Sequence, residues 1–414
     1  MSRAAHRSAS NTERARIAAV YAAFFTNGLI IASWVARLPA VRTRLGASEP
    51  QLGAVLLGIA GGAVVAMPLT SRLCDRFGLR RVLMMAMLGC TAMFVIAGMT
   101  PRIVPLGAVL VAVGFGYGTW DVSMNAAAHD VEVRTERPLM PRFHGAFSVG
   151  GLCGAGLGAG AAALGVPVGA HLAIVGMAIT VTAALVAQQL PDLTETPSRP
   201  SDDDSARFTA TQSEAPRRVI TLRLVLLGLL TACTTLGEGA AADWGAIFFT
   251  DERGATESVA AIGYAAFAGA MAIGRFGGTW VLTRMSRVTA LRASGVLASV
   301  SVLTLITVES MATGLVALVG WGLGVALVFP AAMSAGAENA ERPAQGIATV
   351  ATIGYGGFLV GPPMIGFIAG AAGLGAGLLV VSLLLLLVVV LAPAARRPAP
   401  STAMEREMLH VGTV

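Results

Sequence analysis

Long apolar segments recur along the whole chain and constrain its fold more than any other feature. Twelve of them lie near residues 17–37, 51–71, 82–100, 103–127, 146–164, 168–190, 222–249, 258–283, 288–308, 311–335, 345–370 and 373–394. Each is close to the length of about 20 residues with which a helix crosses a bilayer. Inside a bilayer no water bonds the backbone, and a single apolar segment satisfies its own backbone hydrogen bonds only as a helix. The sequence therefore predicts an all-α polytopic membrane protein with twelve transmembrane helices.

The composition excludes several classes of chemistry. Of the 414 residues, 55% are apolar and only 13% are charged, whereas a soluble domain carries roughly a quarter charged residues. All 29 cationic residues are arginines, so the chain has no P-loop lysine and no Schiff-base lysine. The cysteines stand singly, at Cys74, Cys90, Cys153 and Cys233, a spacing that offers neither a metal site nor a disulfide framework. We therefore expect no cofactor, no metal and no enzymatic activity.

A polar segment divides the apolar runs into six and six. Residues 191–218 hold four prolines, several serines and threonines, and the acidic triplet Asp202, Asp203 and Asp204. A segment of this composition cannot bury a core and is typical of a linker. The sequence thus predicts an N-terminal half over 1–190, a cytoplasmic linker over 191–218, a C-terminal half over 219–395 and a cytoplasmic tail over 396–414.

Internal similarity supports two related halves. At an offset of 206 residues, six glycines and one glutamate of the fourth and fifth runs coincide with the same residue types in the tenth and eleventh. They are Gly114, Gly116, Gly118, Glu132, Gly150, Gly151 and Gly160, which fall on Gly320, Gly322, Gly324, Glu338, Gly356, Gly357 and Gly366. Parallel six-helix repeats with a site between them are an architecture of secondary transporters.

The arginines predict the orientation in the membrane. With the N-terminus inside, the inner segments carry 23 arginines and the outer loops carry five, and Arg275 lies within the eighth run. Positive residues concentrate on the cytoplasmic side of membrane helices. We therefore predict a multi-pass protein of the cell (inner) membrane with both termini in the cytoplasm.

Three arginines depart from the bias, and we expect Arg37, Arg42 and Arg44 either to cap the first helix or to face the mouth of a pathway.

The connection between the second and third runs carries a charged motif, Ser71-Arg72-Leu73-Cys74-Asp75-Arg76-Phe77-Gly78-Leu79-Arg80-Arg81. The segment resembles the signature loop of the major facilitator superfamily, G-x-x-x-D-R-x-G-x-R-R. The matching residues are Asp75, Arg76, Gly78, Arg80 and Arg81, and Ser71 stands where the family has glycine. The resemblance covers nearly the whole chain and implies the twelve-helix fold of that superfamily.

A gating role for this loop follows from the same resemblance. We expect Asp75 to lie against the positive N-terminal end of a helix from the other half and so to hold the cytoplasmic side closed. The alternative is that the arginines of the loop only fix the topology. The corresponding second-half segment, from Gly274 to Arg287, is a degraded copy that lacks the acid.

Ionisable residues inside apolar runs are costly and therefore mark candidate functional sites. Asp121, Asn125 and His129 of the fourth run are four residues apart and share one helical face. The Asp121-x-x-x-Asn125 pair resembles the acid-x-x-x-Asn pattern of the fucose-permease-like branch of the superfamily. That resemblance implies a part for Asp121 in proton coupling and sugar binding. The branch also uses an acid on its first helix, whereas the first run here has none.

The seventh run carries two further acids. Glu238 lies beyond the middle of the run and Asp243 approaches its outer end. We expect Glu238 to face a central cavity. Asp243 either faces the same cavity or pairs with Arg253 or Arg37 outside.

Arg275 is the only cation in the interior of an apolar run, since Arg37, Arg223 and Arg292 lie at or close to the ends of theirs. One hypothesis places it against Asp121 across the two halves, in a charge pair that protonation or substrate would break. The other hypothesis gives Arg275 a local contact within the degraded loop motif.

Together these features favour a secondary active transporter that moves a small solute, a sugar or similar polar metabolite, by alternating access with proton coupling. Trp34 and Trp120 are candidates to stack on a sugar ring, with ordinary packing as the alternative. An exporter of drugs or metabolites in the same superfamily, or a membrane sensor without transport, would also fit. We expect a solute, protons and lipid as partners, a monomer, and no nucleic acid.

Overall fold

The computed structural model describes residues 3–47, 49–189, 220–255 and 257–397. Within these ranges the regular structure is helical, with no strand. The helices are α1 (Arg3–Val35), α2 (Leu38–Leu45), α3 (Glu49–Phe77), α4 (Leu79–Met99), α5 (Ile103–Thr135), α6 (Met140–Ala163), α7 (Val168–Gln189), α8 (Leu222–Ile247), α9 (Glu257–Arg284), α10 (Arg287–Thr307), α11 (Met311–Val325), α12 (Val328–Glu338), α13 (Pro343–Ala372) and α14 (Leu374–Leu391), with short turns η1 (Phe248–Glu252) and η2 (Ala392–Ala395). The predicted linker over 191–218 lies outside the described residues.

The predicted fold of twelve membrane-spanning helices is confirmed. Among the described residues, eleven helical stretches are long and apolar enough to cross a bilayer, and α9 adds a helix of 28 residues. One of the eleven, Met311–Glu338, consists of α11 and α12 together. The break between them follows from Pro330, which has no backbone N–H to bond the carbonyl of Ala326 and whose ring crowds that carbonyl. Helix α2, within the first loop, was not predicted.

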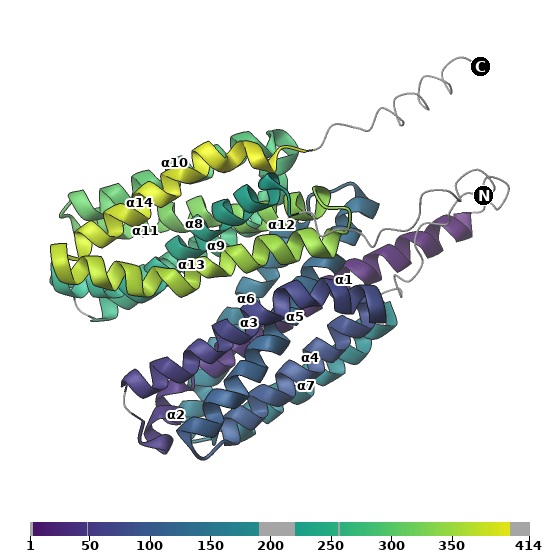
Figure 1. Cartoon of the computed structure of the whole chain (residues 1–414), viewed down its shortest axis with the longest axis horizontal. Helices are drawn as coiled ribbons and strands as arrows, with labels where there is room; N and C mark the ends of the chain where they lie inside the picture. The colour runs from purple at the N-terminus through teal and green to yellow at the C-terminus, as the bar shows by residue number, and fades with distance from the viewer. Residues whose placement is uncertain (1–2, 48, 190–219, 256, 398–414) are drawn as a thin grey trace.

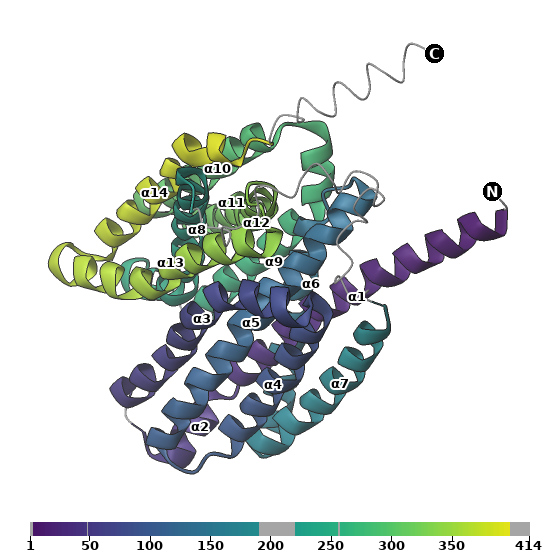
Figure 2. The ribbon, with the colours of Figure 1, turned by 45° about the vertical axis from the view of Figure 1, so that its right-hand side comes forward.

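The helices form two bundles, α1–α7 and α8–α14 (Figure 1). In the first bundle α1 packs on α6 and α3 on α5, and in the second α8 packs on α13 and α9 on α11. The start of α1 and the end of α14 lie at the same end of the molecule, which we call the terminal end, and the opposite end is the distal end (Figures 1 and 2). The ribbons of α3 and α13 converge toward the terminal end and diverge toward the distal end (Figure 1).

A close helix contact of the first bundle has a counterpart in the second. On α5, a Cβ at Gly114 would overlap the carbonyl oxygen of Ile59 on α3, and on α11 a Cβ at Gly322 would overlap that of Phe267 on α9. Small residues at such positions let two membrane helices approach each other closely. Positions 114 and 322 are 208 residues apart. The predicted offset of 206 is therefore wrong by two residues here, and Gly320 instead faces Ser301 on α10.

Candidate functional site between the two bundles

A group of polar side chains, which we call the central polar cluster, lies where the two bundles meet. Its members are Asp121, Asn125, His144, Ser148, Glu238, Arg275 and Tyr355. Asp121 and Asn125 come from one face of α5 and are 4% and 0% exposed. The Asn125 Nδ2 donates to the Asp121 carbonyl oxygen at 2.8 Å and to Asp121 Oδ1 at 3.4 Å. This pairing satisfies the amide donor and leaves Asn125 Oδ1 to accept from another group.

His144, near the start of α6, is that other group. Its Nε2 lies 3.1 Å from Asn125 Oδ1, so with the Asn125 amide in this orientation Nε2 carries the proton and donates. The ring is 5% exposed. Its edge contacts are Phe24 of α1, with ring centroids 5.0 Å apart, and Phe329 of α12 in the second bundle, at 5.2 Å. His144 is thus held between the bundles.

The second bundle contributes a buried ion pair. Arg275 Nη2 on α9 lies 3.2 Å from Glu238 Oε1 on α8, and the two side chains are 5% and 15% exposed. Arg275 Nη1 donates across the bundle interface to Ser148 Oγ at 2.9 Å. The Ser148 hydroxyl in turn donates to the His144 carbonyl oxygen at 3.2 Å. An unpaired charge at this depth would be costly, and Glu238 supplies the countercharge that Arg275 needs.

These bonds form a polar path between two carboxylates on opposite bundles, in which covalent bonds of His144 connect its ring to its carbonyl oxygen. It runs from Asp121 through Asn125 and His144, along the α6 backbone to Ser148, and on to Arg275 and Glu238. The Tyr355 hydroxyl on α13 interacts with Asp121 from the second bundle. Within the described part of the chain, Asp121 Oδ2 is buried without a hydrogen bond of ordinary geometry. The cluster therefore offers a carboxylate with an open acceptor beside an amide, an imidazole and a phenol.

The structure corrects both hypotheses for Arg275. The guanidinium bonds to Glu238 and Ser148, and neither to Asp121 nor within the loop motif. Arg275 lies nine residues before the end of α9 at Arg284, which places it more than two turns inside the helix. The residues that reasoning from sequence missed are His144, Ser148 and Tyr355. A buried asparagine on α5 that requires partners was the signal that could have found His144.

The remaining candidates lie elsewhere. Asp243 is exposed, and the two arginines proposed as its partners donate to backbone carbonyls, Arg37 to Val166 and Arg253 to Leu305. Trp34 and Trp120 are both 0% exposed, and Trp34 packs against Phe94 of α4 with ring centroids 6.0 Å apart. This is packing inside the first bundle, so contact of the two indoles with a solute stays a prediction that the structure does not favour.

The signature loop connects the two bundles at the terminal end. Arg342, the N-cap residue of α13, donates to Asp75 Oδ2 at the end of α3. Gly78 turns the chain from α3 into α4 with φ of 84°, a conformation that side-chain-bearing residues rarely adopt. Arg76 and Arg81 are exposed and Arg80 is half-buried. Asp75 therefore lies at the start of a second-bundle helix, and its role as a gate stays a prediction.

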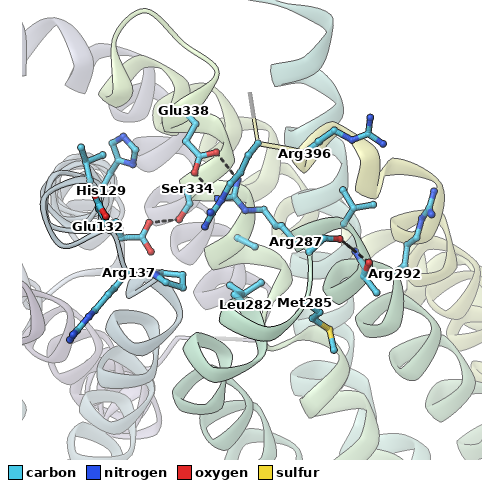
Figure 3. A pocket seen from close by; sticks show the side chains of 18 residues that line it. His129, Glu132, Arg137, Leu282, Met285, Arg287, Arg292, Ser334, Glu338 and Arg396 are labelled. Atoms are coloured by element: carbon cyan, nitrogen blue, oxygen red, sulfur yellow. Dashed lines mark hydrogen bonds and ion pairs between the residues drawn. The ribbon is translucent and has the colours of Figure 1, made fainter. Parts of the chain in front are cut away.

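Further contacts close the terminal end between the bundles. Ser334 Oγ on α12 donates to Glu132 Oε2 on α5 at 2.7 Å (Figure 3). Thr279 Oγ1 on α9 donates to the carbonyl oxygen of Pro138, in the loop after α5, at 2.6 Å. The structure thus represents a conformation in which the bundles are bonded to each other on the terminal side of the central polar cluster.

Known proteins share this architecture. A family model described as Major Facilitator Superfamily matches residues 16–362. An uncharacterized transporter, y4wD, of Sinorhizobium fredii is 33% identical over 91% of this chain and 97% of its own length. Membrane protein MosC of Rhizobium meliloti is 31% identical over 88% of this chain and 86% of its own length.

Solved structures agree at the level of the fold. The transporter FucP in its outward conformation has a TM-score of 0.74 at 18% identity, over 92% of this chain and 98% of FucP. The human organic anion transporter MFSD10 has a TM-score of 0.72 at 19% identity, over 92% of this chain and 99% of its own. One conclusion follows from the two bundles of six spans, the loop around Asp75 and the family match over most of the chain. The chain belongs to the Major Facilitator Superfamily.

Proposed function

We propose that the protein is a secondary active transporter that moves a small polar solute, a sugar or similar metabolite, by alternating access coupled to protons. The observation that carries the proposal is the central polar cluster. Its two carboxylates, Asp121 and Glu238, belong to apolar helices of opposite bundles, and hydrogen bonds of Asn125, His144, Ser148 and Arg275 lie between them. Membrane-embedded ionisable groups are expensive and mark solute and proton pathways.

We further propose that the terminal end faces the cytoplasm of a cell whose inner membrane holds the protein. The segments predicted to lie inside carry 23 of the 29 arginines, as expected for the cytoplasmic side, and the start of α1 and the end of α14 lie at the terminal end. The bonds from Asp75 to Arg342 and from Glu132 to Ser334 then close the cytoplasmic side. The outward conformation described for FucP, which has a similar fold, is consistent with this assignment.

The chemistry of the cluster favours a polar solute. Asp121 Oδ2, the His144 ring and the Tyr355 hydroxyl offer acceptors and donors next to aromatic faces, a combination suited to a solute with several hydroxyl groups. The fucose:proton symporter of E. coli, FucP, is such a transporter with this fold. An apolar drug would leave these buried polar groups unsatisfied, which is costly.

Proton coupling follows from the position of Asp121. A neutral Asp121 would carry a donor where the carboxylate has only acceptors, and the contacts to Asn125 and Tyr355 would have to rearrange. Because those contacts reach both bundles, a proton on Asp121 would change the bonds that hold the bundles together. The partners that we propose are therefore a solute, protons and the bilayer, for a monomer without nucleic acid.

The test is flux in proteoliposomes. A thermal-shift screen of sugars, amino acids and drugs first identifies a solute that stabilises the purified protein. We expect that solute to be transported, and to be concentrated only when a pH gradient is present. Asp121→Asn is expected to abolish the gradient-driven accumulation. The matched control is Asp130→Asn, an acid two turns along the same helix that pairs with Arg134 outside the cluster.

Two results would contradict the proposal. Binding of the solute without flux in either direction would indicate a sensor. Accumulation that is the same with and without a pH gradient would remove the proton coupling.

A further inference from the structure

A second site lies at the terminal end, separate from the central polar cluster. A pocket of about 730 Å³ opens there between the two bundles (Figure 3). The first bundle lines it with the end of α5 and the following loop, and the second lines it with the start of α10, with α12 and with the residues after α14. Along α5, Glu132 in this pocket is about 16 Å from Asp121. The volume is that of a site for a small molecule.

The pocket has an excess of positive charge. Five arginines line it, namely Arg137, Arg287, Arg292, Arg396 and Arg397, against three acids, Glu132, Glu136 and Glu338. Two of the acids are already engaged: Arg287 binds Glu338 through two bonds of 2.6 and 2.8 Å, and Glu132 accepts from Ser334 and from the Met140 backbone. Arg137, Arg292, Arg396 and Arg397 are exposed at the edges of the pocket, and Arg292 Nε donates to the Val389 carbonyl oxygen at 3.4 Å. In Figure 3 the side chains of Arg137 and Arg292 extend to opposite sides, so a shared ligand requires them to turn inward.

Hydrogen bonds to the backbone hold one wall of the pocket in place. Arg223 Nε donates to the Ala394 carbonyl oxygen at 2.8 Å, and Arg287 Nη1 donates to that of Ala395 at 3.3 Å. These bonds fix turn η2, from which Arg396 and Arg397 extend. The backbone from which both arginines extend is thereby held at the edge of the pocket.

Two further features of the pocket favour an anion. Residues 286–289, at the N-terminus of the 21-residue helix α10, line it. Helix N-termini carry partial positive charge, although the Ser286 hydroxyl already accepts from the Thr289 N–H at 3.1 Å. His129 also lines the pocket, is 8% exposed, and has a buried Nδ1 without a hydrogen-bond partner in the described part of the chain. A ligand with several acceptor oxygens would complement the α10 N-terminus and could bond to His129 Nδ1.

We propose that this pocket binds a phosphate-bearing anion through Arg137 on the first bundle and Arg292, Arg396 and the α10 N-terminus on the second. Guanidinium groups bind phosphate with paired, charge-assisted hydrogen bonds. Because the ligand contacts both bundles, it stabilises the conformation in which the terminal end is closed. The binding itself stands on the pocket alone, whereas this conformational effect rests on the proposed alternating access.

Binding is tested with the full-length protein and inorganic tripolyphosphate. We expect wild-type protein in phosphatidylcholine nanodiscs to bind the probe, with an affinity that falls as salt rises. The double variant Arg137→Gln/Arg292→Gln should bind at least about tenfold more weakly, because it loses charge-assisted bonds from both bundles. The matched control, Arg134→Gln/Arg284→Gln, removes two arginines outside the pocket from the same end. It should bind within about twofold of wild type, since only a screened long-range field changes.

The opposite outcomes overturn the proposal. Equal weakening in the two double variants would mean that the whole basic face attracts the probe without a site. Absence of binding to the wild-type protein would exclude the site directly.

A lipid arm identifies the source of the phosphate. If anionic lipid headgroups occupy the pocket, nanodiscs that contain phosphatidylglycerol should weaken tripolyphosphate binding to the control variant by competition. If the ligand is a soluble phosphate compound, the lipid should have no effect. Either result supports an anion site and assigns its ligand.

The conformational effect has a separate readout. Spin labels on Leu164 and Glu309, at the distal ends of the two bundles, should move to longer distances when tripolyphosphate binds. Unchanged distances with intact binding would leave the site in place and overturn its link to alternating access.

Discussion

The central polar cluster and the terminal-end contacts both cross between the bundles, but they differ in burial. The side chains of Arg275 and Glu238 are 5% and 15% exposed. Those of Arg342 and Asp75 are 47% and 41% exposed. Water can solvate the second pair when its bond breaks, whereas the first pair has no such replacement. The same kind of interaction therefore has a high cost of rupture in one region and a low cost in the other.

This difference assigns the two regions different tasks. A buried chain in which Asn125, His144 and Ser148 each have a defined partner fixes the chemistry of the site. An exposed ion pair at the end of α3 can break and form again at little cost, as an element that opens and closes must. Because both regions connect the bundles, the proposed alternating access predicts that a change in either shifts the balance between conformations, whereas only a change in the central polar cluster should alter stability.

The largest effect is expected for Arg275→Gln. The variant leaves Glu238 buried without its countercharge, which typically costs about 3–5 kcal/mol of stability. Thermal or denaturant unfolding in detergent measures the loss. The double variant Arg275→Gln/Glu238→Gln, which removes both charges, should recover a large part of it. Arg284 is an exposed arginine of the same helix. If Arg275→Gln were as stable as Arg284→Gln, the buried ion pair would not contribute the stability assigned to it.

An intermediate effect is expected for His144→Ala. The change leaves the side-chain oxygen of Asn125, Oδ1, buried without its donor, at a cost of about 1–3 kcal/mol of stability. The change should also weaken solute binding. His144→Gln can present an N–H at a similar place and should recover part of both losses. His171→Ala is the matched control, because His171 is also buried, at 4% exposure, but its ring nitrogens have no partner in the described part of the chain. Equal loss of solute affinity in both alanine variants would contradict a role of His144 in the chain.

The smallest effect on stability is expected for Asp75→Asn. An exposed ion pair contributes about 0–1 kcal/mol, so unfolding should change little. The population with a closed terminal end should nevertheless fall, since the bond to Arg342 joins the bundles there. Distance measurements between labels on the two bundles report that population. A population identical to wild type would assign the loop to topology alone.

The sequence predicted the parts of this architecture that depend on local pattern. Apolar length alone located the spans, and the cost of buried charge singled out Asp121, Glu238 and Arg275. Which of these residues meet depends on how each helix is rotated within its bundle, and no residue pattern in a single sequence specifies that rotation. The direct Asp121–Arg275 pair was wrong for this reason, because Asn125, His144 and Ser148 lie between them.

Two details of the structure go beyond the predictions from sequence, and only the first has a signal in the sequence. Pro330 marks the break between α11 and α12, which an unbroken apolar run conceals. The glycine matches at an offset of 206 identified the repeat, but glycine is so abundant, at 50 of 414 residues, that matches two positions out of register also accumulate. The contacts of Gly114 and Gly322 decide the register, and they exist only in three dimensions.

Alternating access between the two bundles is tested most directly by distances measured at both ends of the same protein. One spin-label pair would join Arg134→Cys and Thr283→Cys at the terminal end, and another would join Leu164→Cys and Glu309→Cys at the distal end, with Cys74 and Cys153 replaced by serine. We predict two populations at each end, which shift in opposite directions when a transported solute or a lower pH is applied. A single fixed distance at each end under all conditions, or a change of the same sign at both, would contradict the account.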